Sequence, residues 1–131
     1  SSVGNFGKAA FVTCSNLPYL PIIYLIGSSN GENLKKANFK GAYLYGAYLK
    51  NSNFEKANLS DANLRGANLR WVNLQEANLS GSNLMRADLH ESNLKETNLF
   101  GTNLKMSDGL TQSQIDQAQT NETTKLPDSL E

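Results

Sequence analysis

Residues 57–71 read ANLSD ANLRG ANLRW, one five-residue pattern written three times in succession. Working outward from this stretch, the same unit fills residues 32–106 without a gap, which makes fifteen units. The third position of every unit is Leu or Phe, and the first is small in most units. The second position is Asn in twelve units, Tyr at Tyr43 and Tyr48, and Asp at Asp88. A repeat this regular governs how the whole chain is interpreted.

A period of five fits neither regular secondary structure. On an α-helix, five residues advance the side chain by about 140° past a full turn, so the leucines would form no stripe. On a flat strand, an odd period moves the leucine to the other face in each unit. A chain that turns a corner once per unit keeps positions one and three on the same, inward side. Position five is often Gly, Asn or Asp, which tolerate the positive φ of a type II turn.

Tandem Ala-Asn-Leu-x-x units resemble the pentapeptide repeat proteins, and the resemblance covers residues 32–106. It implies an all-β fold, a right-handed quadrilateral β-helix with four units in each coil. Fifteen units give about 3.75 coils, or a rod about 18 Å tall at the strand spacing of ~4.8 Å. The resemblance assigns the inward centre of each unit to Leu34, Phe39, Leu44, Leu49, Phe54, Leu59, Leu64, Leu69, Leu74, Leu79, Leu84, Leu89, Leu94, Leu99 and Leu104.

The repeat divides the chain into an N-terminal segment (1–31), the β-helix (32–106) and a C-terminal helix with a tail (107–131). Residues 11–14 and 19–26 are strand-like and apolar. We favour an irregular cap for residues 1–31, because an open terminal coil exposes apolar interior and unpaired backbone. One alternative is a degenerate first coil centred on Cys14, Tyr19 and Tyr24, and a second, weaker one is a signal peptide.

The C-terminal segment predicts a short α-helix over residues 111–120. Thr111 and Gln114 have the spacing of a capping box. Leu110, Ile115 and Ala118 supply a thin apolar face, and residues 123–131 read as a loop.

Composition excludes several classes of protein. Twelve basic and twelve acidic residues give a net charge of zero, which disfavours a nucleic-acid binder. One Cys and one His exclude an internal disulfide and a His-rich metal site. The longest apolar run, residues 17–26, is about half of the ~20 residues that span a bilayer. The repeat block carries +3 and the tail from Ser107 carries −4.

No set of residues predicts catalysis, a metal site or a cofactor, so we expect a protein that is not an enzyme. Cys14 has no catalytic His partner, and His90 reads as a solvated turn residue. The recurrent Asn reads as structural, with amides of successive coils bonded in ladders.

The candidate partner-binding surface follows from stacking the units at 20 residues. Two neighbouring sides of the rod then collect side chains that are enriched at interface hot spots, whereas the other two sides carry mostly Ser, Gly, Lys and Glu. The candidate residues are Tyr43, Tyr45, Tyr48, Arg65, Arg70, Trp71 and Arg86.

These observations favour a non-enzymatic structural scaffold or protein–protein interaction module with a protein partner. The resemblance offers one alternative, a DNA mimic that binds gyrase, but mimicry needs an acidic excess that this neutral chain lacks. The tail resembles those of cyanobacterial members, so we expect a bacterial, cytoplasmic protein, with an exported or lumenal location as the alternative. The surplus of apolar residues in 17–26 predicts a homodimer through the N-terminal end, or docking of that segment on a partner. The competing interpretation is a monomer in which the segment folds over its own rod.

Overall fold

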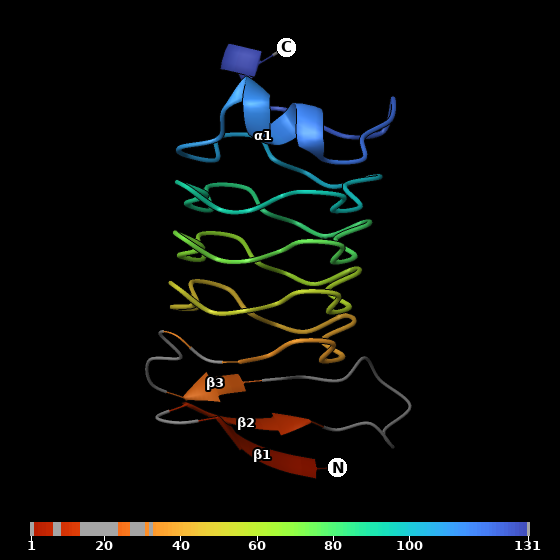
Figure 1. Ribbon diagram of the computed structural model, residues 1–131. Coiled ribbons are helices and arrows are strands. Elements are labelled where there is room, and N and C mark those ends of the chain that lie inside the picture. The colour runs from red at the N-terminus through yellow and green to blue at the C-terminus, as the bar shows by residue number, and fades with distance from the viewer. Residues whose placement is uncertain (1, 7–8, 14–23, 27–30, 32, 131) are drawn as a thin grey trace.

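The computed structural model describes residues 2–6, 9–13, 24–26, 31 and 33–130 of the chain. The repeat forms a rod of stacked coils, with three short strands at its N-terminal end and a helix at its C-terminal end (Figure 1). The expectations for Cys14 and for residues 17–23 lie outside the described residues.

Successive coils are joined by parallel bridges between position-two residues that lie 20 residues apart. The bridge from Asn33 to Asn53 begins the series, and the bridge from Asp88 to Asp108 extends it beyond the last repeat. The third position donates its N–H to the carbonyl of the next coil, as in Leu69 to Asp88 at 2.8 Å. An offset of 20 residues corresponds to the predicted four units per coil.

Each unit ends in a tight turn whose last residue has a positive φ. The N–H of Ala67, for example, donates to the carbonyl of Leu64 at 3.0 Å, which closes the corner. All fifteen position-five residues have φ between 57° and 70°, including the bulky Trp71 (58°) and Arg86 (61°). The positive φ predicted for this position is therefore confirmed, even where the residue is not Gly, Asn or Asp.

The recurrent Asn accepts a hydrogen bond from the position-four N–H, the one backbone donor of each unit that has no backbone partner in the stacked coils. Its Oδ1 accepts a hydrogen bond from the N–H of position four, at 2.9–3.3 Å, in all twelve units that carry Asn. The amide ladders expected from sequence are therefore not the main role of this residue, although Asn93 does donate to Asn73 at 3.2 Å. A buried or half-buried backbone donor requires a partner, and the nearby amide oxygen provides it.

The interior is filled by the residues that the repeat directed inward. All fifteen centre residues are at most 2% exposed, and Phe39 meets Phe54 edge to face with ring centroids 5.6 Å apart. The small first positions are buried beside them from Ala42 onward, except for the half-buried Ala47. Both inward positions are thus confirmed, and the rod is a packed core.

The N-terminal segment differs from the irregular cap that we expected. Strands β1 (Ser2–Phe6), β2 (Ala9–Thr13) and β3 (Tyr24–Ile26) form an antiparallel sheet in the order β1-β2-β3. Tyr24 pairs with Val12, so it does not follow the parallel pattern that a degenerate first coil would give. Apolar residues of high β-propensity favour regular pairing of their backbone groups over an irregular path.

The C-terminal segment packs on the last coil. Helix α1 (Gln112–Gln117) begins at Thr111, where the expected capping box with Gln114 is present. Ile115 is buried, and Leu110 and Ala118 pack partly buried against the core.

The tail is more ordered than the loop we expected. Gln119 and Lys125 form parallel bridges with Asn98 and Asn103, and the 3-10 helix η1 (Asp128–Leu130) follows. The reason is that the last coil would otherwise leave its backbone groups unpaired.

Candidate interaction surface

The rod has two kinds of outer surface, which are defined by the units that form them. We call residues 42–51, 62–71, 82–91 and 102–106 the aromatic faces, since they carry all seven candidate residues. Residues 33–41, 52–61, 72–81 and 92–101 form the other two sides, which we call the asparagine faces, since all eight of their position-two residues are Asn. The bridges Tyr43–Asn63 and Tyr48–Asn68 fix the vertical register of the aromatic faces.

The tyrosines lie on the first coil and are exposed. Tyr43 and Tyr45 stack with their ring centroids 6.2 Å apart and an interplanar angle of 13°. Tyr48 lies one unit further along the same coil and is 43% exposed. The structure thus brings two of the three tyrosines into direct contact and places the third on the adjoining face.

The remaining candidates are distributed over the second and third coils. The N–H of Gly46 donates to the carbonyl of Arg65 at 2.9 Å, so Arg65 lies directly above the corner that follows Tyr45. Trp71 is 56% exposed and stands at the corner on the far edge of the faces from Tyr43. Arg86 occupies an exposed corner one coil beyond Arg65. The seven residues are therefore spread over two faces and three coils, with Tyr43 and Tyr45 in contact on the first coil.

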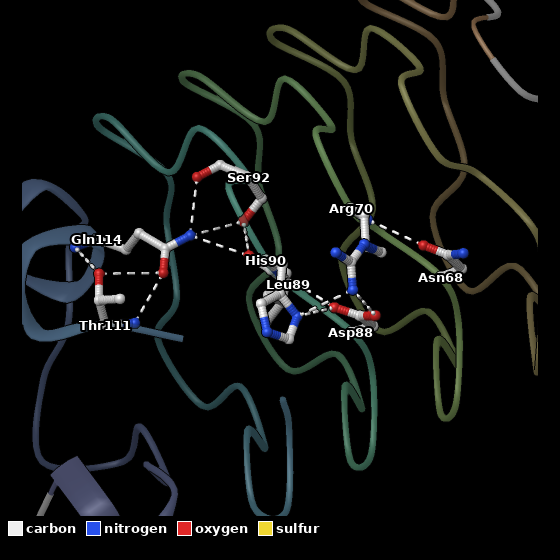
Figure 2. A network of polar contacts seen from close by, with 8 residues as sticks. All are labelled: Asn68, Arg70, Asp88, Leu89, His90, Ser92, Thr111 and Gln114. Atoms are coloured by element: carbon white, nitrogen blue, oxygen red, sulfur yellow. Dashed lines mark hydrogen bonds and ion pairs between the residues drawn. The ribbon is translucent and has the colours of Figure 1, made fainter. Parts of the chain in front are cut away.

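Arg70 belongs to a polar network that the sequence did not reveal (Figure 2). Its Nη1 donates to Oδ2 of Asp88 at 3.2 Å, while Nδ1 of His90 lies 2.6 Å from Oδ1 of Asp88. Because an ionised carboxylate only accepts, Nδ1 of His90 carries the proton and donates it. The 3.5 Å separation between Arg70 Nη1 and His90 Nδ1 is then a contact between two donors.

The network holds Asp88 in its ionised form. Partial burial by itself would raise the pKa of Asp88. The hydrogen bonds from His90 and Arg70 together lower this pKa by more than burial raises it, so the net shift is downward. Asp88 also accepts from the backbone N–H of His90 at 3.1 Å, which is the bond that Asn makes in other units. Asp in place of Asn therefore keeps the turn and adds a charge that orders two neighbouring side chains.

His90 is not the freely solvated turn residue that the sequence suggested. Its ring covers Gly109, where an added Cβ would collide with the ring carbons. Gly109 also has φ of +75°, so the ring and the backbone conformation both favour glycine there. The signals that could have found this arrangement were Asp88, the one Asp at position two in the repeat, and the shared column of Arg70 and His90.

A shallow groove of about 440 Å³ lies between the fourth coil and α1, lined by His90, Ser92, Gly109, Thr111 and Gln114 among others. Its polar groups largely bond to one another. Gln114 Nε2 donates to the carbonyls of Leu89 and Ser92 at 3.0 and 2.9 Å, and its Oε1 accepts from Thr111 N–H (Figure 2). The groove is therefore the seam by which α1 is attached to the rod.

Within residues 33–130 no three His, Cys, Asp or Glu side chains are grouped to hold a metal ion. No helix in the described part of the chain is long and apolar enough to cross a membrane.

Comparisons with known proteins agree with the geometry. The family model for pentapeptide repeats, in eight copies, matches residues 33–70 and 67–105, which is more than half of the chain. A comparison with curated proteins gave no match.

Among solved structures, the chain is similar to a pentapeptide repeat protein from the thylakoid lumen of Arabidopsis thaliana. The two are 29% identical with a TM-score of 0.51, over 66% of this chain and 69% of that one. It is also similar to Rfr23 of the cyanobacterium Cyanothece 51142, at 28% identity and a TM-score of 0.41, over 72% of this chain and 63% of that one. A pentapeptide repeat protein from Nostoc PCC 7120 is 29% identical with a TM-score of 0.36, over 76% of this chain and 69% of that one.

Proposed function

The chain belongs to the pentapeptide repeat family, whose fold is a right-handed quadrilateral β-helix, and from that premise we propose that it is a non-enzymatic protein-interaction module. The binding surface in this proposal is the pair of aromatic faces. A packed rod offers a rigid outer surface, and its described interior is mostly Leu, Phe and Ala. The buried hydroxyls of Ser82, Ser92, Thr97 and Thr102 donate to backbone carbonyls, as structural side chains do.

One observation carries the proposal. Tyr43 and Tyr48 stand where twelve other units use Asn to bond the position-four N–H, and a tyrosine hydroxyl lies too far from its own backbone to replace that oxygen. Both exceptions lie on the aromatic faces, as do Trp71 and all three arginines of the chain. Residues that depart from a local folding rule and gather on one surface are typical of functional sites.

The test is capture of a partner from a native lysate by the immobilised protein and two variants. In the first variant, Tyr43→Asn with Tyr48→Asn, both positions regain the residue of the repeat. The control is Phe100→Ser, which removes an exposed aromatic residue (40%) from the asparagine faces and restores the Ser found at the stacked positions 60 and 80.

We expect the tyrosine variant to lose the captured protein and the Phe100→Ser variant to keep it. Thermal unfolding of all three proteins serves as the check on folding. If a folded tyrosine variant captures the same partner at an undiminished level, the aromatic faces are not the binding surface.

The alternative function, mimicry of DNA toward gyrase, receives no support from the charge distribution. The aromatic faces carry five basic and two acidic residues, and the described residues of the asparagine faces include five basic and four acidic ones. A surface that replaces phosphates needs carboxylates instead. We expect no inhibition of gyrase supercoiling at micromolar protein, and clear inhibition would reverse this judgement.

Two further expectations remain proposals. A homodimer through residues 17–26 predicts a concentration-dependent mass in light scattering, and a constant mass near 14.3 kDa would exclude it. A cytoplasmic location predicts recovery in the cytoplasmic fraction of the source bacterium, whereas recovery outside that fraction would indicate export.

A further inference from the structure

We infer that the aromatic faces bind a carboxylate-rich segment of a partner polypeptide, which Arg65 and Arg86 recognise by charge and the exposed aromatic residues by apolar contact. This inference rests on the proposed function and specifies the chemistry of its partner.

The first argument is the division of charge around the rod. The aromatic faces hold five basic residues (Lys50, Arg65, Arg70, Arg86 and Lys105) and two acidic ones, a net charge of +3. The described residues of the asparagine faces include five basic and four acidic ones, a net charge of +1. Most of the positive charge of the rod therefore lies on the side that also carries the exposed Tyr and Trp residues, and a surface of one sign attracts the opposite sign.

The second argument is how those charges are used within the chain. Each pair of faces uses some of its basic residues in ion pairs. Lys35 pairs with Glu55 at 2.8 Å and Lys56 lies 3.7 Å from Glu76 on the asparagine faces. On the aromatic faces Arg70 lies 3.2 Å from Asp88, and Lys105 lies 3.3 Å from Asp128. Over the part of the chain that the structure describes, no ion pair is recorded for Lys50, Arg65 or Arg86. Folding therefore does not account for the two arginines through an internal salt bridge.

The third argument is geometry. Arg65 follows Tyr45 in one vertical column, and Arg86 lies one coil beyond, so successive coils about 4.8 Å apart present one guanidinium each. A guanidinium binds a carboxylate with two parallel hydrogen bonds, and Arg is preferred over Lys for this purpose. Tyr45, which is 57% exposed, provides apolar area in the column of Arg65, and Trp71, which is 56% exposed, provides it at the far corner of the same faces.

The C-terminal end favours a short acidic segment over a nucleic acid. Asp128 lies 3.3 Å from Lys105, and Asp108 continues the column of Asp88, so the positive surface ends at the fourth coil. A phosphate backbone that runs the length of the rod would meet these carboxylates. A short polypeptide segment can stop before them.

The experiment is an NMR titration of the 15N-labelled full chain. The probe is a short poly-L-glutamate peptide, and poly-L-lysine and oligo-dT of equal length are the comparisons. We expect amide shifts confined to the aromatic faces with poly-L-glutamate, affinity that falls several-fold as salt is raised, and no binding of poly-L-lysine. Oligo-dT should bind more weakly than poly-L-glutamate.

Two matched variants test the arginines. Arg65→Gln with Arg86→Gln should weaken binding of poly-L-glutamate about three- to tenfold, since each exposed charge pair contributes modestly. Lys40→Gln with Lys36→Gln removes the same charge from the same two positions of the repeat on the asparagine faces, and it should change the affinity less than about twofold. Arg86, Lys36 and Lys40 are exposed and Arg65 is half-buried, and the unfolding curves of both variants verify the fold.

Three results would overturn the inference: equal losses in both variants, amide shifts on the asparagine faces, or tighter binding of oligo-dT. If poly-L-glutamate does not bind while lysate capture still depends on Tyr43 and Tyr48, the acidic partner is wrong and the interaction module stands. If capture is also independent of the tyrosines, the proposed function fails with it.

Discussion

On the asparagine faces all eight position-two residues are Asn, whereas on the aromatic faces four are Asn, two are Tyr and one is Asp. Behind both surfaces the interior is the same, because every centre residue is Leu or Phe and at most 2% exposed. The coil bridges also continue through Tyr43, Tyr48 and Asp88 without interruption.

The difference teaches that the fold constrains the inward positions much more than the outward ones. Two units have given up the Asn bond and still stack, so that bond contributes to stability without being required in every unit. The outer surface is therefore free to diverge between faces, and where it diverges it acquires the aromatic residues, the arginines and the Asp88 network.

The largest expected effect comes from truncating a buried leucine. It tests whether the interior is packed equally well behind the two kinds of face. Leu69→Ala, behind an aromatic face, and Leu79→Ala, behind an asparagine face, should each lower the free energy of unfolding by about 2–5 kcal/mol. Both leucines are fully buried, so each leaves a cavity. Urea denaturation measures both, and losses that differ several-fold between the two would show that the interiors are unequal.

Overpacking should give the next largest effect. Ala67 and Ala77 are each 1% exposed, and Leu in either position has no free volume to occupy. We expect each Ala→Leu variant to lose about 1–3 kcal/mol of unfolding free energy. A Leu variant as stable as the parent chain would refute the inward assignment of position one on that side.

The local role of Asn can be measured on both surfaces. Asn68→Ala and Asn78→Ala each remove the acceptor for a position-four N–H, at 3.1 and 2.9 Å, and each should cost about 0.5–1.5 kcal/mol. Asn68→Asp should be mild because the carboxylate still accepts. Thermal melts compare the three, and an Ala variant without loss would remove the structural explanation for the repeat's Asn.

The corner residues should give a smaller change of opposite sign. Trp71 and Glu76 adopt φ of 58° and 59°, which disfavours side chains other than glycine. Trp71→Gly and Glu76→Gly should each raise the unfolding free energy by about 0.5–1 kcal/mol, after the entropy of glycine is subtracted. A destabilised Trp71→Gly variant, measured beside Glu76→Gly, would mean that the indole packs productively on the rod.

The smallest expected effect is the dependence of stability on pH. One carboxyl contributes to it on each kind of face, Glu55 on the asparagine faces and Asp88 on the aromatic faces. Hydrogen bonding to Lys35 lowers the pKa of Glu55, and the His90 and Arg70 contacts lower that of Asp88. A lowered pKa in the folded state stabilises the protein above the ordinary carboxyl value, and the contribution is lost as the pH falls through the lowered value.

The stability advantage of the parent chain over Asp88→Asn and over Glu55→Gln should therefore shrink below about pH 4. Melting temperatures from neutral to acidic pH measure both differences. An advantage over Asp88→Asn that grows on acidification would contradict the assigned direction of its pKa.

Much of the rod could be predicted because its rules are contained in each unit. Leu64, Ala67 and Gly66 illustrate this, since side-chain size and turn preference at five-residue spacing give the interior and the corners. The role of Asn68 was harder to predict, because an amide can bond along the rod or within its own turn. The choice depends on which backbone donors the stacked coils leave unpaired.

The candidate surface was only partly predictable. The 20-residue spacing placed Arg70 and His90 in one column. Asp88, whose carboxylate bonds to both, lies in a different column, so predicting this link would have required the positions of the side chains. At the N-terminus, the pairing of Val12 with Tyr24 is a contact between residues twelve apart that no local pattern specifies.

The repeat alone therefore dictates the interior, the corners and the two kinds of outer surface, because each depends on residues within one unit and on a constant offset between units. Stacking in three dimensions decided the contacts among Arg70, Asp88, His90 and Gly109, and the pairing of the tail with the last coil. Apart from the local contact between Asp88 and His90, these contacts join residues about 20 apart through side-chain reach and unpaired backbone groups, which exist only once the coils have formed.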